Sequence, residues 1–482
     1  MGESRSGRIL SLGAGLALVF GLGGCRQREP DNLERPSRKD NPGQLGAGRN
    51  PGVMGQQGQQ GYPTLSPEVR SLDSDRVPTP IKVPEITGTA LEPVALEGVR
   101  GWVTRIPGAA ILPSVAYGDG RVYVSGGFQS TSVFALASSS GKLSWRRDQL
   151  EDNGPTAAIF DEGRLVFNTE SCTLFNLEAS TGKKVWHKWL GDPTLTQPAV
   201  VRDKVLASHP TRGATAWALS AYKLSSGGQL WTADLDGELL SAPVISGDAA
   251  YVATVAGTLY RFSVSSGARA WSRAMAASTA PWLEGDALYV GRRVKDDSER
   301  MVMVDAKTGE ILREEATRKG YLGDLPRDLH DWEQVWRYEG SRPLVIDGTR
   351  YVAMGDLLSA TDAKTGAPRW ERQYFWNDGP AKADTVGKRA LASVAYANGQ
   401  LVVASRGGEV YGVDAASGRT RWAYALGAPL QSQPIVAHGW VYLTTSDGRV
   451  IGLEAGDASL DGWHMWGGGP GHNGPNPLAG AL

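Results

Sequence analysis

Cysteine is scarce in this chain, whose 482 residues include two, Cys25 and Cys172. Two thiols cannot supply the disulfide framework of a small secreted scaffold, so the folded part must be stabilised by packing. An excess of basic charge is missing as well, because the net charge is -1 and the sequence pI is about 6.6. Nucleic-acid binding needs a clustered basic surface, and we therefore set that class of function aside.

Long apolar runs are also rare, and the run from Ile9 to Leu22 is too short to span a membrane. It follows Arg5 and Arg8 and ends in Leu-Gly-Gly-Cys25, which is the order of parts in a secretory signal. This segment resembles the signal of bacterial lipoproteins, in which the cysteine becomes the lipidated first residue. The resemblance implies a signal peptide over residues 1–24, lipidation of Cys25 and, from Arg26, an outer-membrane anchor. The alternative is an incidental or buried cysteine.

Residues 25–98 are rich in Pro, Gly and Gln and show no sustained apolar period. This composition predicts a flexible tether between the anchor and the folded part. The rest of the chain differs, because 62 Gly, 16 Trp and 15 Tyr residues with only 21% charged residues favour a turn-rich β protein.

A repeat of about 45 residues runs through the chain from residue 99. Each unit ends in a turn with glycine four residues before a tryptophan, as in SSSGKLSW and ASTGKKVW, and Arg313 takes the tryptophan's place once. The glycine supplies the positive φ that ends the turn. The repeated tryptophans are Trp102, Trp145, Trp186, Trp231, Trp271, Trp370, Trp422 and Trp463.

Within each unit, segments of period-two alternation separated by Gly and Asp predict four antiparallel strands. The fold class is therefore all-β, an eight-bladed β-propeller of four-stranded antiparallel blades over residues 99–475, with a C-terminal tail over residues 476–482. We expect each tryptophan to wedge between neighbouring blades. The last unit lacks a fourth strand after residue 454, and the stretch GWVTRIP that contains Trp102 is expected to supply it.

The spacing, the G-x-x-x-W endings and the D-A-x-T-G turns resemble the pyrroloquinoline-quinone-like (PQQ-like) propeller repeat over residues 100–475. Within this family a lipoprotein with eight blades looks like the BamB branch, scaffold subunits of the outer-membrane β-barrel assembly machinery. That resemblance implies a protein-binding scaffold without cofactor or catalytic residues, whose partners are barrel-assembly proteins. A generic PQQ-like binding module of the periplasm or cell surface remains an alternative. A PQQ-dependent dehydrogenase is less favoured, because the adjacent cysteine pair of those enzymes is missing here.

Two connections between blades are long, from Arg313 to Pro343 and from Trp370 to Ser393. Alternating strand directions place both on one face, with two smaller elaborations between second and third strands. Long loops in compact domains are commonly functional, and clustered aromatic residues are frequent binding hot spots. The candidate partner-binding residues are Trp332, Trp336, Tyr338, Tyr374, Phe375 and Trp376. The alternative is that this stripe packs on the propeller rim.

Other candidates favour structural roles. The segment WHMWGGGPGHNG resembles an edge segment of these propellers, so His464 and His472 are expected to be structural rather than metal ligands. Asp305, Asp362 and Asp414 recur once per unit, as turn residues would. Cys172 stands at a hairpin tip, where we expect an exposed position and an inert or reactive thiol. We assign no metal site.

Overall fold

The computed structural model describes residues 70–72, 78–84, 86, 91–109, 111–127, 129–191, 197–211, 216–293, 298–315, 318–319, 344–354, 357–373, 391–430 and 432–461. The chain separates into two units, Met1–Gln59 and Gln60–Leu482, and all described residues belong to the second. Every regular element in these ranges is a β-strand. None of the described segments forms a helix with the length and apolar character needed to cross a membrane.

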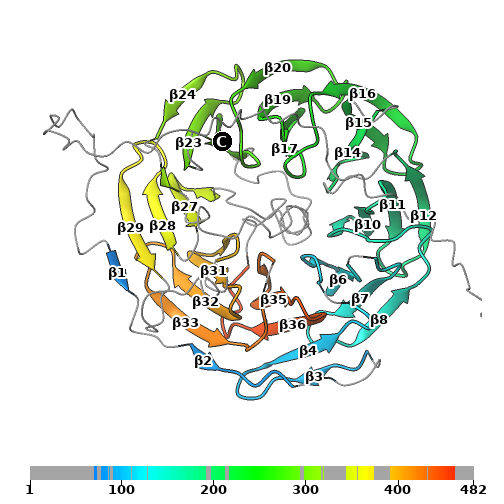
Figure 1. Ribbon diagram of the computed structural model, residues 1–482. Coiled ribbons are helices and arrows are strands. Elements are labelled where there is room, and N and C mark those ends of the chain that lie inside the picture. The colour runs from blue at the N-terminus through cyan, green and yellow to red at the C-terminus, as the bar shows by residue number, and fades with distance from the viewer. Residues whose placement is uncertain are drawn as a thin grey trace, which may run out of the picture. The chain divides into compact units, whose positions relative to one another are not determined.

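Eight sheets, each built on four antiparallel strands, make up the described part of this unit, and Figure 1 shows them arranged radially as the blades of a propeller. Blade 1 contains β5 (Ala116–Gly118), β6 (Arg121–Ser125), β7 (Val133–Ala137) and β8 (Leu143–Arg147). Blade 2 contains β9 (Ile159–Asp161), β10 (Arg164–Asn168), β11 (Thr173–Glu178) and β12 (Lys184–Trp189). Blade 3 contains β13 (Ala199–Val201), β14 (Lys204–Pro210), β15 (Trp217–Lys223) and β16 (Gln229–Leu235). Blade 4 contains β17 (Val244–Ser246), β18 (Ala249–Ala253), β19 (Thr258–Ser263) and β20 (Arg269–Ala274).

The second half of the ring repeats this order. Blade 5 contains β21 (Trp282–Glu284), β22 (Ala287–Arg293), β23 (Ser298–Asp305) and β24 (Ile311–Glu314), with β25 (Arg318–Lys319) paired to β23. Blade 6 contains β26 (Leu344–Ile346), β27 (Thr349–Met354), β28 (Leu357–Asp362) and β29 (Pro368–Gln373). Blade 7 contains β30 (Ala395–Ala397), β31 (Gln400–Ala404), β32 (Glu409–Asp414) and β33 (Thr420–Ala425). Blade 8 contains β34 (Ile435–Ala437), β35 (Trp440–Thr444), β36 (Arg449–Glu454) and β4 (Gly101–Arg105). The predicted eight-bladed fold is confirmed.

The two ends of the folded region meet in blade 8. Strand β4 pairs antiparallel with β36, with Trp102 opposite Gly452 and Val103 opposite Ile451. Arg100 and Glu454 reinforce the junction, because Nε of Arg100 lies 2.8 Å from Oε2 of Glu454. The N-terminal stretch that contains Trp102 thus supplies the fourth strand of the last blade, as the sequence predicts.

Three short strands before β4 correct the interpretation of residues 25–98 as one flexible tether. Strand β1 (Arg70–Leu72) pairs parallel with β29, and β2 (Thr79–Pro80) pairs parallel with β33. Strand β3 (Val94–Ala95) pairs antiparallel with β4. Figure 1 shows all three outside the ring, where they cover the outer edges of blades 6, 7 and 8. An open strand edge invites unwanted pairing, and these strands remove that edge from three blades.

Six indoles join neighbouring blades by the same contact. In each, Nε1 donates to a carbonyl oxygen just after the third strand of the next blade, at 2.7–3.2 Å. The pairs are Trp102 with Ser138, Trp145 with Ala179, Trp186 with Leu224, Trp231 with Val264, Trp271 with Ala306 and Trp370 with Ala415. Each of these six indoles therefore links its blade to the next one.

The turn glycines have a second role beside their backbone conformation. Gly141 and Gly418 have φ values of 70° and 71°, as expected for the residue that ends the turn. A Cβ on Gly141 would lie 2.4 Å from the ring of Trp102, and one on Gly418 would lie 2.6 Å from Trp370. Each glycine therefore also makes room for the indole of the preceding blade.

The seam between blades 7 and 8 differs from this pattern. Trp422 donates from Nε1 to Oε1 of Gln400 in its own blade, at 2.8 Å. The reason lies in blade 8, whose fourth strand comes from the other end of the folded region. That blade has no turn from its third to its fourth strand, and so the turn glycine that lies against an indole elsewhere has no counterpart at this position. Trp463, the last member of the predicted series, lies outside the described residues.

Candidate functional site

The loop face of the propeller, defined by the connections between blades and between second and third strands, is the candidate site. Two hairpins are longer than their counterparts on this face. Strands β14 and β15 pair as far as Pro210 and Trp217, and β22 and β23 as far as Arg293 and Glu299. Strand β25 adds to the tip of the second hairpin, with Arg318 opposite Glu299. The long connection after blade 5 therefore begins along an extended hairpin.

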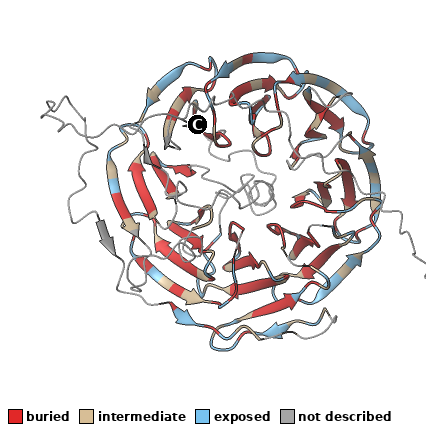
Figure 2. Cartoon of the chain, in the orientation of Figure 1, coloured by how far each residue is buried: buried red, intermediate tan, exposed pale blue. Residues whose placement is uncertain are grey.

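Among the described residues, two exposed large apolar side chains belong to this face. Trp189, the last residue of β12, is 67% exposed and donates from Nε1 to the carbonyl oxygen of Ser171 at 3.1 Å. Val255, in the hairpin between β18 and β19, is 60% exposed. An indole held by one hydrogen bond while most of its surface faces solvent can contact a protein partner with little loss of side-chain freedom. Figure 2 shows the contrast between the buried inner strands and the more exposed outer strands.

Charge gathers where the long connection leaves blade 5. Nη1 of Arg292 lies 2.5 Å from Oε1 of Glu314, and Nη1 of Arg300 lies 3.6 Å from Oε2 of the same carboxylate. All three side chains remain between 29% and 42% exposed. Partly exposed ion pairs of this kind contribute little to stability but can orient an approaching partner.

Glu170 connects the hairpins of blades 1 and 2 on the same face. Burial raises the pKa of the Glu170 carboxyl to about 7. A hydrogen bond from the backbone N–H of Gln129 acts to lower this pKa, but burial has the larger effect. The nearby Asp152 carboxylate also raises the pKa of Glu170. The half-buried carboxyl of Glu170 is therefore expected to lose its proton near neutral pH.

Asp152 itself has a structural role. Burial acts to raise its pKa, but hydrogen bonds from Ser171, Thr173 and Thr169 outweigh burial and lower it. Oγ1 of Thr169 donates to Oδ2 of Asp152 at 2.7 Å. Asp236 makes the matching contact in the next pair of blades, where Oγ1 of Thr254 donates to Oδ1 at 2.7 Å. The recurrence shows that these aspartates hold hairpin tips in place.

The turn aspartates behave as the sequence predicts. Oδ1 of Asp305 accepts from the backbone N–H of Thr308 at 2.7 Å. Asp362 accepts in the same way from Thr365 at 2.8 Å, and Asp414 from Ser417 at 2.8 Å. In the described ranges, no three His, Cys, Asp or Glu side chains gather in a group that could hold a metal ion.

Cys172 corrects one expectation, because its thiol is buried rather than exposed at the hairpin tip. Its φ of 62° matches the backbone conformation that glycine provides in the sister hairpins. The hairpin that carries Cys172 packs between blades 2 and 3, and Cys172 belongs there to an apolar cluster with Leu174, Leu190 and Val200. Burial in an apolar cluster removes the access that a reactive thiol requires.

The remaining candidates from the sequence lie outside the described residues: Cys25, Trp332, Trp336, Tyr338, Tyr374, Phe375, Trp376, His464 and His472. The structure thus places the two ends of each long connection on the loop face but not the aromatic residues within them. Sequence reasoning missed Trp189 because it lies at a strand end beside the repeated Trp186 and follows no loop signal.

Comparison with known proteins fits this architecture. The family model described as outer membrane protein assembly factor BamB matches residues 89–217, 215–324 and 353–470, well over half of the chain. The chain belongs to the BamB family. A BamB of Shewanella oneidensis is 24% identical over 378 residues, which cover 73% of this chain and 85% of that protein. A BamB of Yersinia pestis is 24% identical over 363 residues, covering 69% and 84%.

Solved structures extend the likeness in fold. BamB from Moraxella catarrhalis superposes with a TM-score of 0.54 at 16% identity, covering 73% of this chain and 98% of that one. A quinohemoprotein alcohol dehydrogenase from Pseudomonas putida superposes with a TM-score of 0.53 at 13% identity, covering 76% and 77%. At these identities the structures establish a shared propeller fold for BamB proteins and the dehydrogenases, and the fold alone does not separate their functions.

Proposed function

We propose that this chain is a non-catalytic scaffold of the bacterial envelope that binds proteins through its loop face and serves outer-membrane β-barrel assembly. The observation that carries the proposal is the asymmetry of the ring. One face bears two extended hairpins and the described ends of both long connections, and the described connections on the opposite face are tight turns. Membership of the BamB family supports the role in assembly.

The lipidated Cys25 would hold the protein at the outer membrane, with the propeller in the periplasm or at the cell surface. Residues 26–69 would then connect the anchor to strand β1 on blade 6. Mass spectrometry of the purified protein tests the anchor, because a diacyl or triacyl adduct on an N-terminal Cys25 is expected. Cys25→Ala should release the protein from the membrane fraction, and membrane retention of that variant would contradict lipid anchoring.

Affinity capture tests the partners. The full-length lipidated protein is recovered from detergent-solubilised envelopes and its companions are identified by mass spectrometry. Recovery of the barrel-assembly subunits in stoichiometric amount is expected. Recovery without any of these subunits would instead support a generic PQQ-like binding module.

Variants make the capture specific to the loop face. Trp332→Ala with Trp376→Ala should weaken the affinity for the partner at least about thirtyfold and lower its recovery, since a single hot-spot aromatic already contributes about 2 kcal/mol or more. The melting temperature should stay within about 1 °C of the parent, because loop side chains that face a partner do not stabilise the blades. A large drop in melting temperature would show that the aromatic stripe packs on the rim. Lys364→Glu on the opposite face serves as the matched control.

The alternative to a scaffold is an enzyme, because the same propeller fold also occurs in dehydrogenases. Dye-linked alcohol oxidation by the purified protein after addition of PQQ and Ca²⁺ would establish a dehydrogenase and overturn the scaffold proposal. We expect no turnover, because the chain has no pair of adjacent cysteines of the kind that characterises those enzymes.

A further inference from the structure

The outer strands of blades 6 and 7 accept short strands from the N-terminal part of the chain at one repeated place. Strand β1 runs parallel to β29, and Leu72 lies opposite Gln373, the third residue after the repeated tryptophan. Strand β2 runs parallel to β33, and Pro80 lies opposite Ala425, again the third residue after the tryptophan. The backbone N–H of Ile81 then donates to the carbonyl oxygen of Ala425 at 2.8 Å. The chain itself therefore shows that this part of an outer strand accepts a parallel strand.

Blade 2 presents the same edge without a strand on it. Its outer strand β12 pairs with β11 on the inner side, and the described part of the chain places no strand on the outer side. The N–H of Leu190 donates to the carbonyl oxygen of Cys172 at 2.8 Å, and such inward bonds alternate along an antiparallel pair. The backbone N–H and C=O groups of His187 and Trp189 therefore point outward. Trp189 is the third residue after the repeated tryptophan, so its carbonyl group corresponds to that of Ala425.

Side-chain exposure separates this edge from the covered ones. In the three covered blades the residue after the repeated tryptophan is buried, since Glu371, Ala423 and Val103 are 7%, 6% and 0% exposed. His187 holds this place in blade 2 and is exposed. Trp189, two residues further and on the same face of the strand, is 67% exposed. An incoming strand would cover in blade 2 the surface that the chain's own strands cover elsewhere.

Trp189 also distinguishes blade 2 from blades 1, 3 and 4, whose outer strands end their sheets in the same way. The residue at this register is Asp148 in blade 1, Asp234 in blade 3 and Ala274 in blade 4. The indole is held in place, because its Nε1 donates to the carbonyl oxygen of Ser171 at 3.1 Å. Sheet edges that bind extended peptides combine backbone pairing, which gives affinity, with side-chain contacts, which give specificity. The edge of β12 offers both.

The position of blade 2 in the ring favours a strand from another molecule. Strands β1, β2 and β3 lie on blades 6, 7 and 8 in that order, and continuing the order backwards leads to blade 5. Blades 5, 4 and 3 separate blade 6 from blade 2 on one side, and blades 7, 8 and 1 on the other. Figure 1 shows β12 across the ring from β1 and β29. A strand on β12 is therefore expected from a partner.

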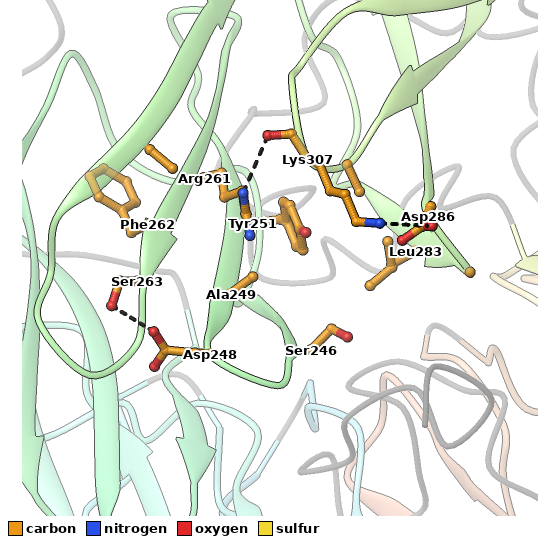
Figure 3. A pocket seen from close by; sticks show the side chains of 13 residues that line it. Ser246, Asp248, Ala249, Tyr251, Arg261, Phe262, Ser263, Leu283, Asp286 and Lys307 are labelled. Carbon is orange, nitrogen blue, oxygen red and sulfur yellow. Dashed lines mark hydrogen bonds and ion pairs between the residues drawn. The ribbon is translucent and has the colours of Figure 1, made fainter. Parts of the chain in front are cut away.

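A cavity between blades 4 and 5 suits a partner less well. It has a volume of about 460 Å³, and Figure 3 shows that polar side chains around it bond to one another. Nζ of Lys307 lies 3.2 Å from Oδ2 of Asp286, and Oγ of Ser263 donates to Oδ2 of Asp248 at 2.8 Å. Tyr251, which also lines the cavity, is 4% exposed. The described lining thus offers no exposed aromatic ring, in contrast to the edge of β12.

We propose that the outer edge of β12 at residues 187–189, named here the blade-2 edge, binds an extended segment of a partner polypeptide as an added parallel strand. A backbone N–H of the segment donates to the carbonyl oxygen of Trp189, as that of Ile81 does to Ala425. An apolar side chain of the segment packs on the exposed indole. The proposal rests on the proposed function in that the ligand is a polypeptide, and it adds backbone pairing to the contacts of the loop face.

Short peptides test the blade-2 edge without any envelope partner, so the capture of assembly proteins succeeds or fails separately. Saturation-transfer NMR on the full-length chain in deuterated detergent, with a detergent blank, measures binding of Ac-Lys-Thr-Val-Thr-Val-Thr-Lys-NH2. Two analogues carry N-methyl groups on the valines or on the threonines. A strand pairs with one neighbour through alternate N–H groups, so one analogue should lose at least fivefold in saturation and the other should keep it. No saturation by the unmodified peptide, or equal saturation by the two analogues, would overturn the proposal.

Variants locate the binding. Trp189→Ala removes the exposed ring and should lower saturation of the unmodified peptide at least fivefold, with a melting temperature within about 1 °C of the parent. Leu230→Ala is the matched control, because it truncates a 46% exposed side chain on the outer strand of blade 3 and should leave saturation unchanged. Undiminished binding by a folded Trp189→Ala protein would overturn the proposal.

Two other occupants of the blade-2 edge have their own signatures. Peptide binding that appears only after deletion of residues 26–69 would identify the chain's own N-terminal part as the occupant. A dimer of the parent protein in analytical ultracentrifugation that Trp189→Ala dissociates would identify a second copy of this chain. Either result would overturn the proposal, and we expect a monomer that binds the peptide with residues 26–69 present.

Discussion

Arg313 donates a hydrogen bond from Nη2 to the carbonyl oxygen of Ala363 at 2.6 Å, and so performs in one seam what an indole performs in six others. A guanidinium between blades needs a counter-charge, and Glu315 supplies it at 3.1 Å. Glu315 also binds Arg350 through both oxygens, at 2.5 and 2.6 Å. The Arg350 side chain is 3% exposed. The seam between blades 5 and 6 therefore replaces an aromatic wedge by a buried ionic one.

Breaking this ionic wedge should cost more than replacing it. Arg350→Ala leaves the Glu315 carboxylate without its bidentate partner in a poorly solvated seam, and we expect a loss of about 3–5 kcal/mol in the free energy of unfolding. Arg313→Met, Glu315→Met and Arg350→Met together should stay within about 1 kcal/mol of the parent, because apolar residues of similar volume avoid the desolvation penalty and no charge is left without a partner. Urea denaturation of the single and the triple variant measures both. A triple variant as unstable as Arg350→Ala would show that the ionic group itself stabilises the seam.

The closing indole should matter more than the one that stays within its blade. Trp102→Ala removes a buried wedge that holds the N-terminal strand to blade 1, and about 3–5 kcal/mol should be lost. Trp422→Ala removes a half-buried indole bound to Gln400 of the same blade, and about 1 kcal/mol is expected. Equal losses in thermal or urea unfolding would argue against closure by β4. Deletion of residues 98–107 should abolish the cooperative transition.

A pair of glycines separates backbone strain from steric crowding. Gly348 and Gly418 both have positive φ, at 67° and 71°. A Cβ on Gly348 meets nothing within 4 Å, whereas one on Gly418 meets the ring of Trp370 at 2.6 Å. Gly348→Ala should therefore cost about 1–2 kcal/mol, and Gly418→Ala a further 1–3 kcal/mol, roughly the cost of overpacking. Calorimetric melting of both variants measures the two losses in stability. Identical losses for Gly348→Ala and Gly418→Ala would contradict the close fit of glycine and indole.

The pH dependence of stability should reveal Glu170. Because its pKa is raised from 4.5 to about 7 by burial, the folded protein holds a proton that the unfolded chain releases between these values. Its contribution to the free energy of unfolding therefore falls as pH rises from about 4.5 to about 7, and stays low above. Glu170→Gln should raise the melting temperature by roughly 1–2 °C at pH 8 and leave it unchanged near pH 4.

Glu178→Gln provides the contrasting control for the same measurement. Hydrogen bonds from Thr181 and Ser180 lower the pKa of Glu178, so its carboxylate adds stability above pH 4.5 that is lost as pH falls. This variant should lower the melting temperature at pH 8. If Glu170→Gln instead lowered the melting temperature at pH 8, as Glu178→Gln is expected to do, the Glu170 carboxyl would not be buried as described.

The eight-bladed ring can be predicted from the sequence because the residue types that recur in each repeat have one structural role each. Glycine at positive φ and tryptophan at the outer strand mark each blade, and even Arg313 can be located by its register with them. The missing fourth strand of the last repeat likewise identifies the strand of Trp102. Patterns of this kind depend on residues that are close together in the chain, and so they can be recognised in a single sequence.

Other features depend on contacts between distant segments and leave little sequence signal. Strands β1 and β2 have three and two residues and pair through backbone groups, so no alternation marks them. The burial of Cys172 follows from how its hairpin packs against blade 3. The stacking of Phe160, Tyr117 and Tyr396 on tyrosines of the preceding blades likewise becomes visible only when the seams between blades are assembled.

The amount of folded outer-membrane barrel proteins in cells that lack this gene tests the account most directly. Heat-modifiable mobility on gels measures the folded fraction, and the gene is returned as the parent form or with Trp332→Ala and Trp376→Ala. The account predicts fewer folded barrels without the gene, recovery with the parent form and poor recovery with the loop variant at equal protein level. Unchanged barrel levels in the deletion strain would contradict a role in assembly.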